Sequence, residues 1–159
     1  MATGCNESQF ILRRAAVDDL PQLVGLIERY YDEWHVVQRD PPERIAEYLS
    51  SPEPCGFFIA ELEHALAACV LLRELPRLES ALECKRLYVL PEFRGHGLAS
   101  KVMDSAEALA SRFADWLYLD TGRDFAAAQS LYKARGYEAC ERYNDNPQAV
   151  FFYRKRIRN

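Results

Sequence analysis

Residues 89–99 read Val-Leu-Pro-Glu-Phe-Arg-Gly-His-Gly-Leu-Ala and join an apolar segment to an amphipathic one. Residues 84–90 have the branched and aromatic content of a strand, and Pro91 ends it because proline cannot donate to a sheet ladder. The segment that follows carries apolar residues three and four positions apart, which predicts a helix. These residues are Leu98, Val102, Ala106, Leu109 and Phe113. The stretch therefore predicts a strand, a glycine-containing turn and a helix.

The turn has the features of an anion-binding site. The first backbone N–H groups of a helix have no partner within the helix and carry partial positive charge. Gly95 and Gly97 allow an anion to approach this backbone closely, and Arg94 adds a formal charge. Alone, Arg94 would be interpreted as a solvated surface arginine, but the two glycines and the helix start favour a phosphate site.

Two common phosphate ligands do not fit the turn. A P-loop requires Gly-x-x-x-x-Gly-Lys-Ser/Thr, whereas here Ser100 precedes Lys101. The dinucleotide fingerprint requires a third glycine three residues after Gly97, and that position is Ser100. We therefore do not expect a nucleoside triphosphate, NAD or FAD.

Two motifs together resemble one enzyme family. Arg94-Gly95-His96-Gly97-Leu98-Ala99 matches the Arg/Gln-x-x-Gly-x-Gly/Ala signature of the GCN5-related N-acetyltransferases (GNAT). Residues 128–137, Ala-Gln-Ser-Leu-Tyr-Lys-Ala-Arg-Gly-Tyr, resemble the family's Ala-x-x-Leu-Tyr-x-x-x-Gly-Phe/Tyr element, and the spacing leaves room for one helix and one strand. The resemblance implies an α/β fold (mixed α+β) with a central, mostly antiparallel, splayed mixed sheet flanked by helices. The length of 159 residues predicts a single domain over residues 1–159, and the resemblance covers about residues 9–157.

The resemblance implies acetyl-CoA as co-substrate. By analogy with the family, the backbone of Leu87, Tyr88 and Val89 pairs with the pantetheine arm, and the turn holds the pyrophosphate. The turn consists of Arg94, Gly95, His96, Gly97, Leu98, Ala99 and Ser100. His96 occupies an open position of the signature, so we expect its backbone N–H to matter and its imidazole not to. Many members have an asparagine at the position of Phe125, which would instead pack against the cofactor.

The expected reaction is direct attack of a primary amine on the thioester. Backbone N–H groups near Tyr88 and Val89 would stabilise the developing oxyanion. Tyr132 is the predicted proton donor to the leaving thiolate. A tyrosine with a pKa of about 10 is protonated at neutral pH and is a workable donor to a thiolate whose conjugate acid has a pKa of about 8.5. Helical spacing alone would also allow Tyr132 to be a core residue beside Phe125 and Ala128. The family context favours catalysis.

The amine must lose a proton before it attacks. A lysine-like amine with a pKa of about 10.4 is mostly protonated at neutral pH, so a carboxylate near the acetyl site would help. Glu83 is the predicted base, because it lies at the head of the strand where the family often has a glutamate, and Glu79 is the reserve. The alternative is that Glu83 is a solvated charge paired with Lys85 or Arg135.

The acceptor site is less well defined by the sequence. The resemblance places it between the first two helices and the loop before the last strand, where Tyr30, Trp34 and Asp145 lie. Aromatic and acidic side chains suit a small amine or amino acid, although Tyr30 and Trp34 can equally be core residues of a helix. A protein α-amine or lysine acceptor, and a non-catalytic acyl-CoA-binding module, are the alternatives.

Composition narrows the partners and the compartment. The 159 residues carry a net charge of −4, which argues against a nucleic-acid or anionic-membrane surface. Five scattered cysteines and three histidines without ligand spacing indicate neither disulfides nor a metal site. The longest apolar run, residues 65–72, is too short to span a bilayer, and no signal peptide is evident. We expect a cytoplasmic protein, and the resemblance allows a homodimer.

Overall fold

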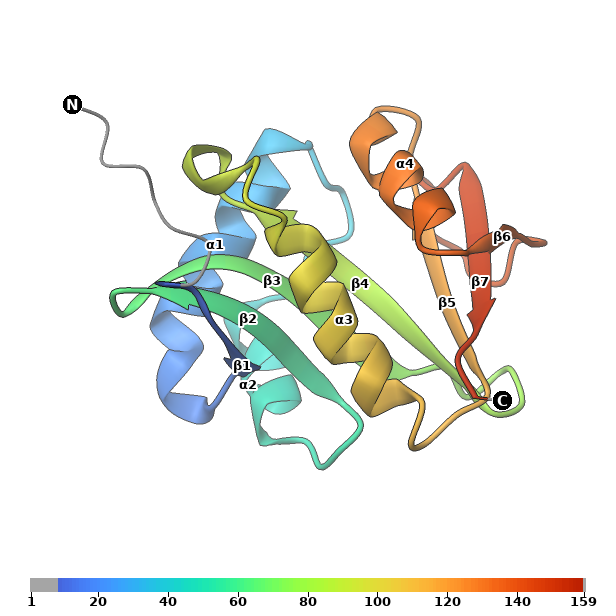
Figure 1. Ribbon diagram of the computed structural model, residues 1–159, viewed down its shortest axis with the longest axis horizontal. Coiled ribbons are helices and arrows are strands. Elements are labelled where there is room, and N and C mark those ends of the chain that lie inside the picture. The colour runs from blue at the N-terminus through green and yellow to red at the C-terminus, as the bar shows by residue number, and fades with distance from the viewer. Residues whose placement is uncertain (1–8, 159) are drawn as a thin grey trace.

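The computed structural model describes residues 9–158, and these form a seven-stranded sheet in the order β1-β2-β3-β4-β5-β7-β6 (Figure 1). The strands are β1 (Ile11–Arg14), β2 (Gly56–Leu62), β3 (Ala65–Glu74), β4 (Ala81–Val89), β5 (Trp116–Thr121), β6 (Glu138–Ala139) and β7 (Phe151–Arg156). The helices are α1 (Leu20–Glu33), α2 (Pro42–Ser50), α3 (Leu98–Ala110) and α4 (Ala126–Ala134). Every pairing is antiparallel except β4 with β5. The predicted open, mixed, mostly antiparallel sheet is confirmed.

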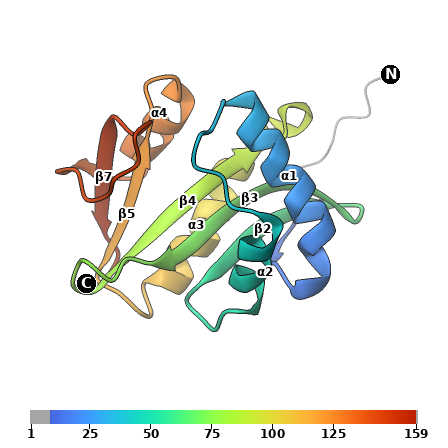
Figure 2. The same ribbon diagram turned by 180° about the vertical axis from the view of Figure 1, so that it is seen from behind.

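Helices cover both faces of the sheet. Helix α3 crosses one face (Figure 1), and α1 and α2 lie on the other (Figure 2). The fully buried Val102 and Ala106 pack α3 against the sheet, as the helical spacing predicted, and Met103 joins them. Leu23 and Ile27 anchor α1 on the opposite face. Full burial of one large aliphatic side chain stabilises the fold by about 1.5–3 kcal/mol. Helices α3 and α1 therefore stabilise the sheet from its two faces, with β4 between them.

One predicted core position of α3 is wrong. Phe113 lies beyond the end of the helix, and 43% of its surface is exposed. The chain tightens after Ala110, where Arg112 N bonds Leu109 O at 3.0 Å and Phe113 N bonds Ala110 O at 2.9 Å. This three-residue spacing turns the chain toward β5 and carries Phe113 off the apolar face.

Strands β4 and β5 diverge after a short parallel contact. Ala81, Leu82 and Glu83 pair with residues 116–118, and the strands then separate, as Figure 1 shows. On its other edge β4 pairs with β3, and the register shifts between Cys69 and Leu71. Such a bulge bends a strand and redirects its side chains. The predicted splay is thus present, and it opens beyond Glu83.

The C-terminal hairpin is uneven, because β6 has two residues and β7 has six. Cys140 N still bonds Phe152 O at 2.8 Å, but the chain then leaves the sheet and returns only at β7. We call residues 141–150 the insertion loop. Its amide side chains turn inward, since Asn144 and Asn146 both donate to Asp120. Polar contacts inside the wedge therefore replace ladder bonds in this segment.

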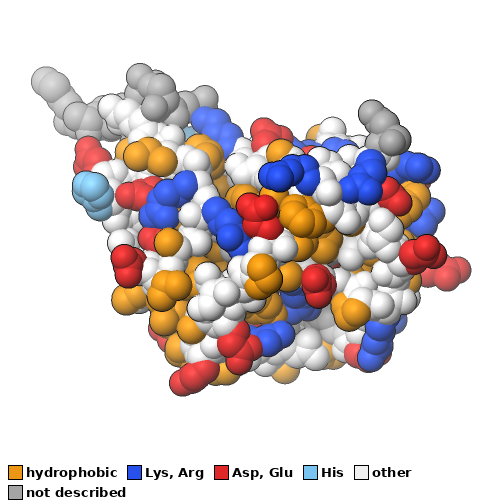
Figure 3. All heavy atoms as spheres, turned by 90° about the horizontal axis from the view of Figure 1, so that it is seen from below, with side chains coloured by type: hydrophobic (Ala, Val, Ile, Leu, Met, Phe, Trp, Pro, Cys, Tyr) orange, Lys and Arg blue, Asp and Glu red, His pale blue; other side chains and the backbone are white. Residues whose placement is uncertain are grey.

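Positive and negative side chains are interspersed on the face of the molecule drawn in Figure 3. None of the helices within residues 9–158 has the length and apolar character needed to cross a membrane.

Candidate active site

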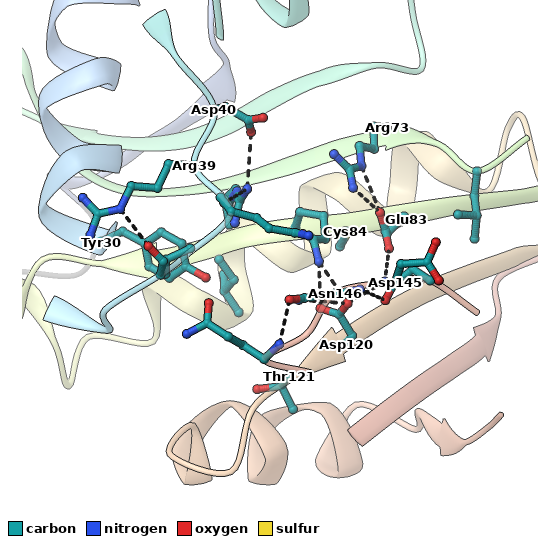
Figure 4. Close-up of a pocket in the computed structure, with 18 of the residues that line it drawn as sticks. Tyr30, Arg39, Asp40, Arg73, Glu83, Cys84, Asp120, Thr121, Asp145 and Asn146 are labelled. Atoms are coloured by element: carbon teal, nitrogen blue, oxygen red, sulfur yellow. Dashed lines mark hydrogen bonds and ion pairs between the residues drawn. The ribbon is translucent and has the colours of Figure 1, made fainter. Parts of the chain in front are cut away.

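A cavity of about 1070 Å³ lies in the wedge between the two parts of the sheet (Figure 4). Its walls come from α1, the segment after α1, α2, β3, β4, β5, α4 and the insertion loop. The predicted residues among its lining are Tyr30, Trp34, Glu83, Leu87, Tyr132 and Asp145. The structure therefore gathers the expected donor, base and acceptor-site residues around one space, although they are spread over 116 positions from Tyr30 to Asp145.

The glycine turn has the geometry of an anion cradle. Gly95 has φ +87° and Gly97 has φ +71°, a left-handed conformation that favours glycine. A Cβ atom on either residue would meet nothing within 4 Å, so the space beside the backbone is open. The first bond at the start of α3 runs from Lys101 N to Gly97 O at 3.1 Å, which leaves the N–H groups of residues 98–100 ahead of it. The turn fits a pyrophosphate.

Arg94 and His96 have different surroundings. Arg94 Nη2 contacts both carboxylate oxygens of Glu33, at 2.9 and 2.6 Å, and its Nε donates to Val89 O at 3.1 Å. The side chain of Arg94 is 44% exposed, so its charge is accessible at the edge of the turn. The His96 ring instead packs 5.9 Å from the ring of Phe10. This packing agrees with a structural use of its imidazole.

Tyr132 is both a core residue and a cavity residue. Only 6% of it is exposed, and its ring lies 5.8 Å from that of Tyr137 and 6.2 Å from that of Tyr153. Burial raises the pKa of Tyr132 well above the usual value for tyrosine. The hydroxyl therefore keeps its proton at neutral pH, as a proton donor must. The two interpretations of this residue are compatible.

Glu83 is buried rather than solvated. It is the third residue of β4 and 1% exposed. Arg73 holds Oε1 through Nε at 2.9 Å and Nη2 at 2.8 Å, and Asn144 donates to Oε2 at 3.3 Å. The alternative of a solvated charge paired with Lys85 or Arg135 is wrong, because both cations pair elsewhere. Arg135 ties α4 to α3 instead, through Glu107.

Lys85 and Asp120 form a bridge across the open wedge. Lys85 Nζ lies 2.9 and 3.0 Å from the two oxygens of Asp120, and the side chains are only 9% and 5% exposed. Asn144 also donates to Asp120 at 2.6 Å. Asp120 was not among the predicted site residues; the available signal was an acid in the mostly apolar segment Trp116–Thr121. The bridge lies two residues beyond the last paired position, Glu83.

The segment between α1 and α2, residues 34–41, covers the cavity, and we call it the roof segment. It runs over the β4 side of the sheet (Figure 2). Gln148 of the insertion loop clamps it: Val37 N donates to Oε1 at 2.8 Å, and Nε2 donates to His35 O at 3.0 Å. The ring of Trp34 packs 4.7 Å from that of Phe125, so Phe125 contacts the roof. Both parts of the sheet thus hold the roof.

A splayed sheet with an anion cradle at one helix start and a cavity in the wedge defines a CoA-dependent acyltransferase. The model of the Acetyltransferase (GNAT) family matches residues 20–137. The chain belongs to this family of acetyl-CoA-dependent N-acetyltransferases. Within the described residues 9–158, no group of three or more His, Cys, Asp or Glu side chains is placed to hold a metal ion.

Solved structures share the fold at low sequence identity. A GNAT-family acetyltransferase from Staphylococcus aureus aligns with a TM-score of 0.79 and 18% identity over 93% of this chain and 99% of its own. The PaiA N-acetyltransferase of Thermoplasma acidophilum, in complex with coenzyme A, gives 0.75 and 15% over 92% and 98%. N-acetylglutamate synthase from Neisseria gonorrhoeae, with coenzyme A and N-acetyl-glutamate, gives 0.76 and 16% over 93% and 35%. No curated protein matches the chain.

Proposed function

We propose that the protein transfers an acetyl group from acetyl-CoA to the primary amine of a small molecule or amino acid. We choose a small acceptor because the roof segment lies over the cavity and is held to the insertion loop by Gln148. An acceptor enclosed beneath this roof is small. A polypeptide acceptor would require residues 34–41 to move away from the insertion loop.

The cofactor would lie along β4 and reach the glycine turn. Beyond Glu83 the β5-facing edge of β4 is unpaired in the described sheet, so the backbone of residues 87–89 can bond an extended pantetheine arm. Arg94 and the N–H groups of residues 95–100 would hold the pyrophosphate. Acetyl-CoA supplies the thioester. The same β4 edge offers N–H groups near Tyr88 and Val89 to stabilise negative charge.

Two side chains would move the protons. Tyr132, protonated and lining the cavity, would donate to the departing thiolate. Glu83 would accept the amine proton, through a water, at Oε2, since Oε1 is held by Arg73 and the bond from Asn144 to Oε2 is long at 3.3 Å. Arg73 and Asn144 would keep the carboxylate of Glu83 directed into the cavity.

Release of free thiol from acetyl-CoA tests this function. The wild-type protein is assayed against small primary amines, amino acids, and peptides with a free N-terminus or a lysine. We expect turnover with members of the small-molecule group and at least tenfold less with peptides. Turnover confined to peptides would replace the proposed acceptor class. Binding of coenzyme A, measured by calorimetry, without thiol release for any amine would favour the non-catalytic module.

A further inference from the structure

Arg86 lies on β4 where the bulge redirects side chains. Its φ is +59°, a left-handed conformation that costs energy for a residue other than glycine. Successive residues of a regular strand point to opposite faces, yet Lys85, Arg86 and Leu87 all line the cavity. The bulge therefore brings a second cation of β4 to the space where the acceptor is expected.

The guanidinium of Arg86 is buried with few partners. Its side chain is 10% exposed, Nη2 donates to Gln38 O at 2.8 Å, and its ion-pair partner Asp40 has Oδ2 3.5 Å from Nη2. The Tyr30 hydroxyl also interacts with the guanidinium. Nε is hidden from solvent and has no hydrogen-bond partner in the described part of the chain. A guanidinium carries five N–H donors, and a buried charge is costly unless it is paired.

Two other cations of the cavity, the part-buried Arg73 on β3 and the buried Lys85 on β4, are better matched. Arg73 makes contacts of 2.9 and 2.8 Å to Glu83 and donates to Tyr48 at 3.2 Å. Lys85 contacts both oxygens of Asp120 within 3.0 Å. The charges of Arg73 and Lys85 are therefore neutralised by carboxylates of the protein. Of these three cations, Arg86 has the most unused capacity to bind oxygen atoms of a ligand.

An aromatic ring also packs against the guanidinium of Arg86. Its central carbon lies 5.2 Å from the centre of the Tyr31 ring, which is itself buried. Cation–π contact of this kind favours a fixed orientation, and a fixed planar fork is suited to a carboxylate. The same side chain holds the roof segment through Gln38 O. An acceptor bound there would contact the floor and the roof of the cavity together.

We propose that Arg86 recognises a carboxylate of the acceptor, so that the substrate is a primary amine that also bears a carboxylate, as an amino acid does. This inference rests on the proposed function and names its substrate class. The carboxylate binds the guanidinium, while the amine lies toward Leu87 and Glu83. Arg86 is a specificity-determining residue and takes no part in proton transfer.

The test compares amino acids with their α-carboxamides, in which the negative charge is removed and the amine is kept. For the wild-type protein we expect kcat/KM to be 10- to 100-fold higher for the carboxylate, about the value of one charge-assisted bidentate contact. Arg86→Gln should bring this ratio close to one, and Arg86→Lys should restore part of it. Arg44→Gln is the matched control, because Arg44 also lines the cavity but is 51% exposed and pairs with Glu47. It should keep the wild-type ratio.

Calorimetry on the CoA-saturated protein separates this inference from the proposed function. Binding of the amino acid but not of its carboxamide, lost in Arg86→Gln, supports the Arg86 site even if no thiol is released. An equal loss for both ligands in Arg86→Gln would show that Arg86 only anchors the roof, and would overturn the inference. Equal wild-type affinity for both ligands, or binding of neither, would overturn it as well.

Discussion

The two parts of the sheet differ in what holds them together. Strands β1 to β4 form a continuous antiparallel ladder between helices, whereas β5 joins β4 by parallel pairing only at residues 81–83 of the described chain. Beyond that point side chains replace the backbone bonds: Lys85 with Asp120, and Gln148 with the roof segment. The site lies where backbone pairing stops. Each part of the sheet contributes only some of the side chains of the site.

The largest expected effect comes from breaking the bridge across the wedge. Asp120→Ala leaves Lys85, 9% exposed, without its counter-ion, and loss of one partner of a buried pair costs about 3–5 kcal/mol. Urea denaturation should show this loss of unfolding free energy. The control is Glu138→Ala, which breaks a pair with Arg154 whose side chains are 59% and 39% exposed and should cost under about 1 kcal/mol. Equal losses would mean that the bridge does not hold the two parts together.

Removal of the Tyr132 hydroxyl tests the contribution of the C-terminal part to the chemistry. Tyr132→Phe should lower kcat by about 100-fold, the lower range for loss of a general acid, and leave the affinity for coenzyme A within twofold. Tyr137→Phe is the control, because its buried hydroxyl donates to Glu107 at 2.8 Å on the α3 side. That variant should lose stability and keep kcat. A normal rate for Tyr132→Phe would remove Tyr132 from the mechanism.

The pH profile gives a second test of Tyr132. Burial raises its pKa above the ordinary tyrosine value of about 10, so the donor stays protonated as pH rises. The wild-type kcat should therefore show no decline between pH 7 and about pH 10 from loss of this proton. A descending limb near pH 8 that disappears in Tyr132→Phe would mean that the pKa of Tyr132 is lowered in the working enzyme.

The N-terminal part should control cofactor affinity. Arg94→Ala is expected to raise the Kd of coenzyme A about tenfold, because one charge-assisted contact to the pyrophosphate is lost. Arg29→Ala is a nearby control, since Arg29 is 52% exposed and pairs with Glu92. Calorimetry at two salt concentrations should show a weaker salt dependence for Arg94→Ala than for the control. An unchanged Kd would mean that the backbone N–H groups of the turn bind the pyrophosphate without Arg94.

The way the two parts of the sheet meet also explains which features the sequence could predict. The glycine turn, with Gly95 at φ +87° and Gly97 at φ +71°, depends on local residues and spacing, and it was predicted. The partner of Glu83 was not, because Arg73 reaches it through the register of β3 with β4. The Gln148 clamp joins residues 111 and 113 positions apart. Such contacts depend on how the two parts of the sheet come together, and no local pattern indicates them.

The smallest effect tests how the glycine turn is connected to the acceptor cavity. Glu33, the last residue of α1, holds Arg94 at 2.6 Å and also accepts a bond from Tyr88 Oη at 3.3 Å. A pyrophosphate in the turn would compete with this carboxylate for the guanidinium. Glu33→Gln should therefore lower the Kd of coenzyme A by about two- to fivefold, the value of a partly exposed ion pair.

The matched control for Glu33→Gln is Asp32→Asn, on the same helix turn, whose carboxylate is 76% exposed and pairs with Arg39. It should leave the Kd unchanged. If Glu33→Gln instead weakens binding, Glu33 positions Arg94 for the cofactor rather than competing with it. Since Trp34 follows Glu33 directly and begins the roof, competition would link arrival of the cofactor to the cover of the acceptor site. The sign of this small change therefore shows whether Glu33 competes with the cofactor for Arg94 or positions Arg94 for it.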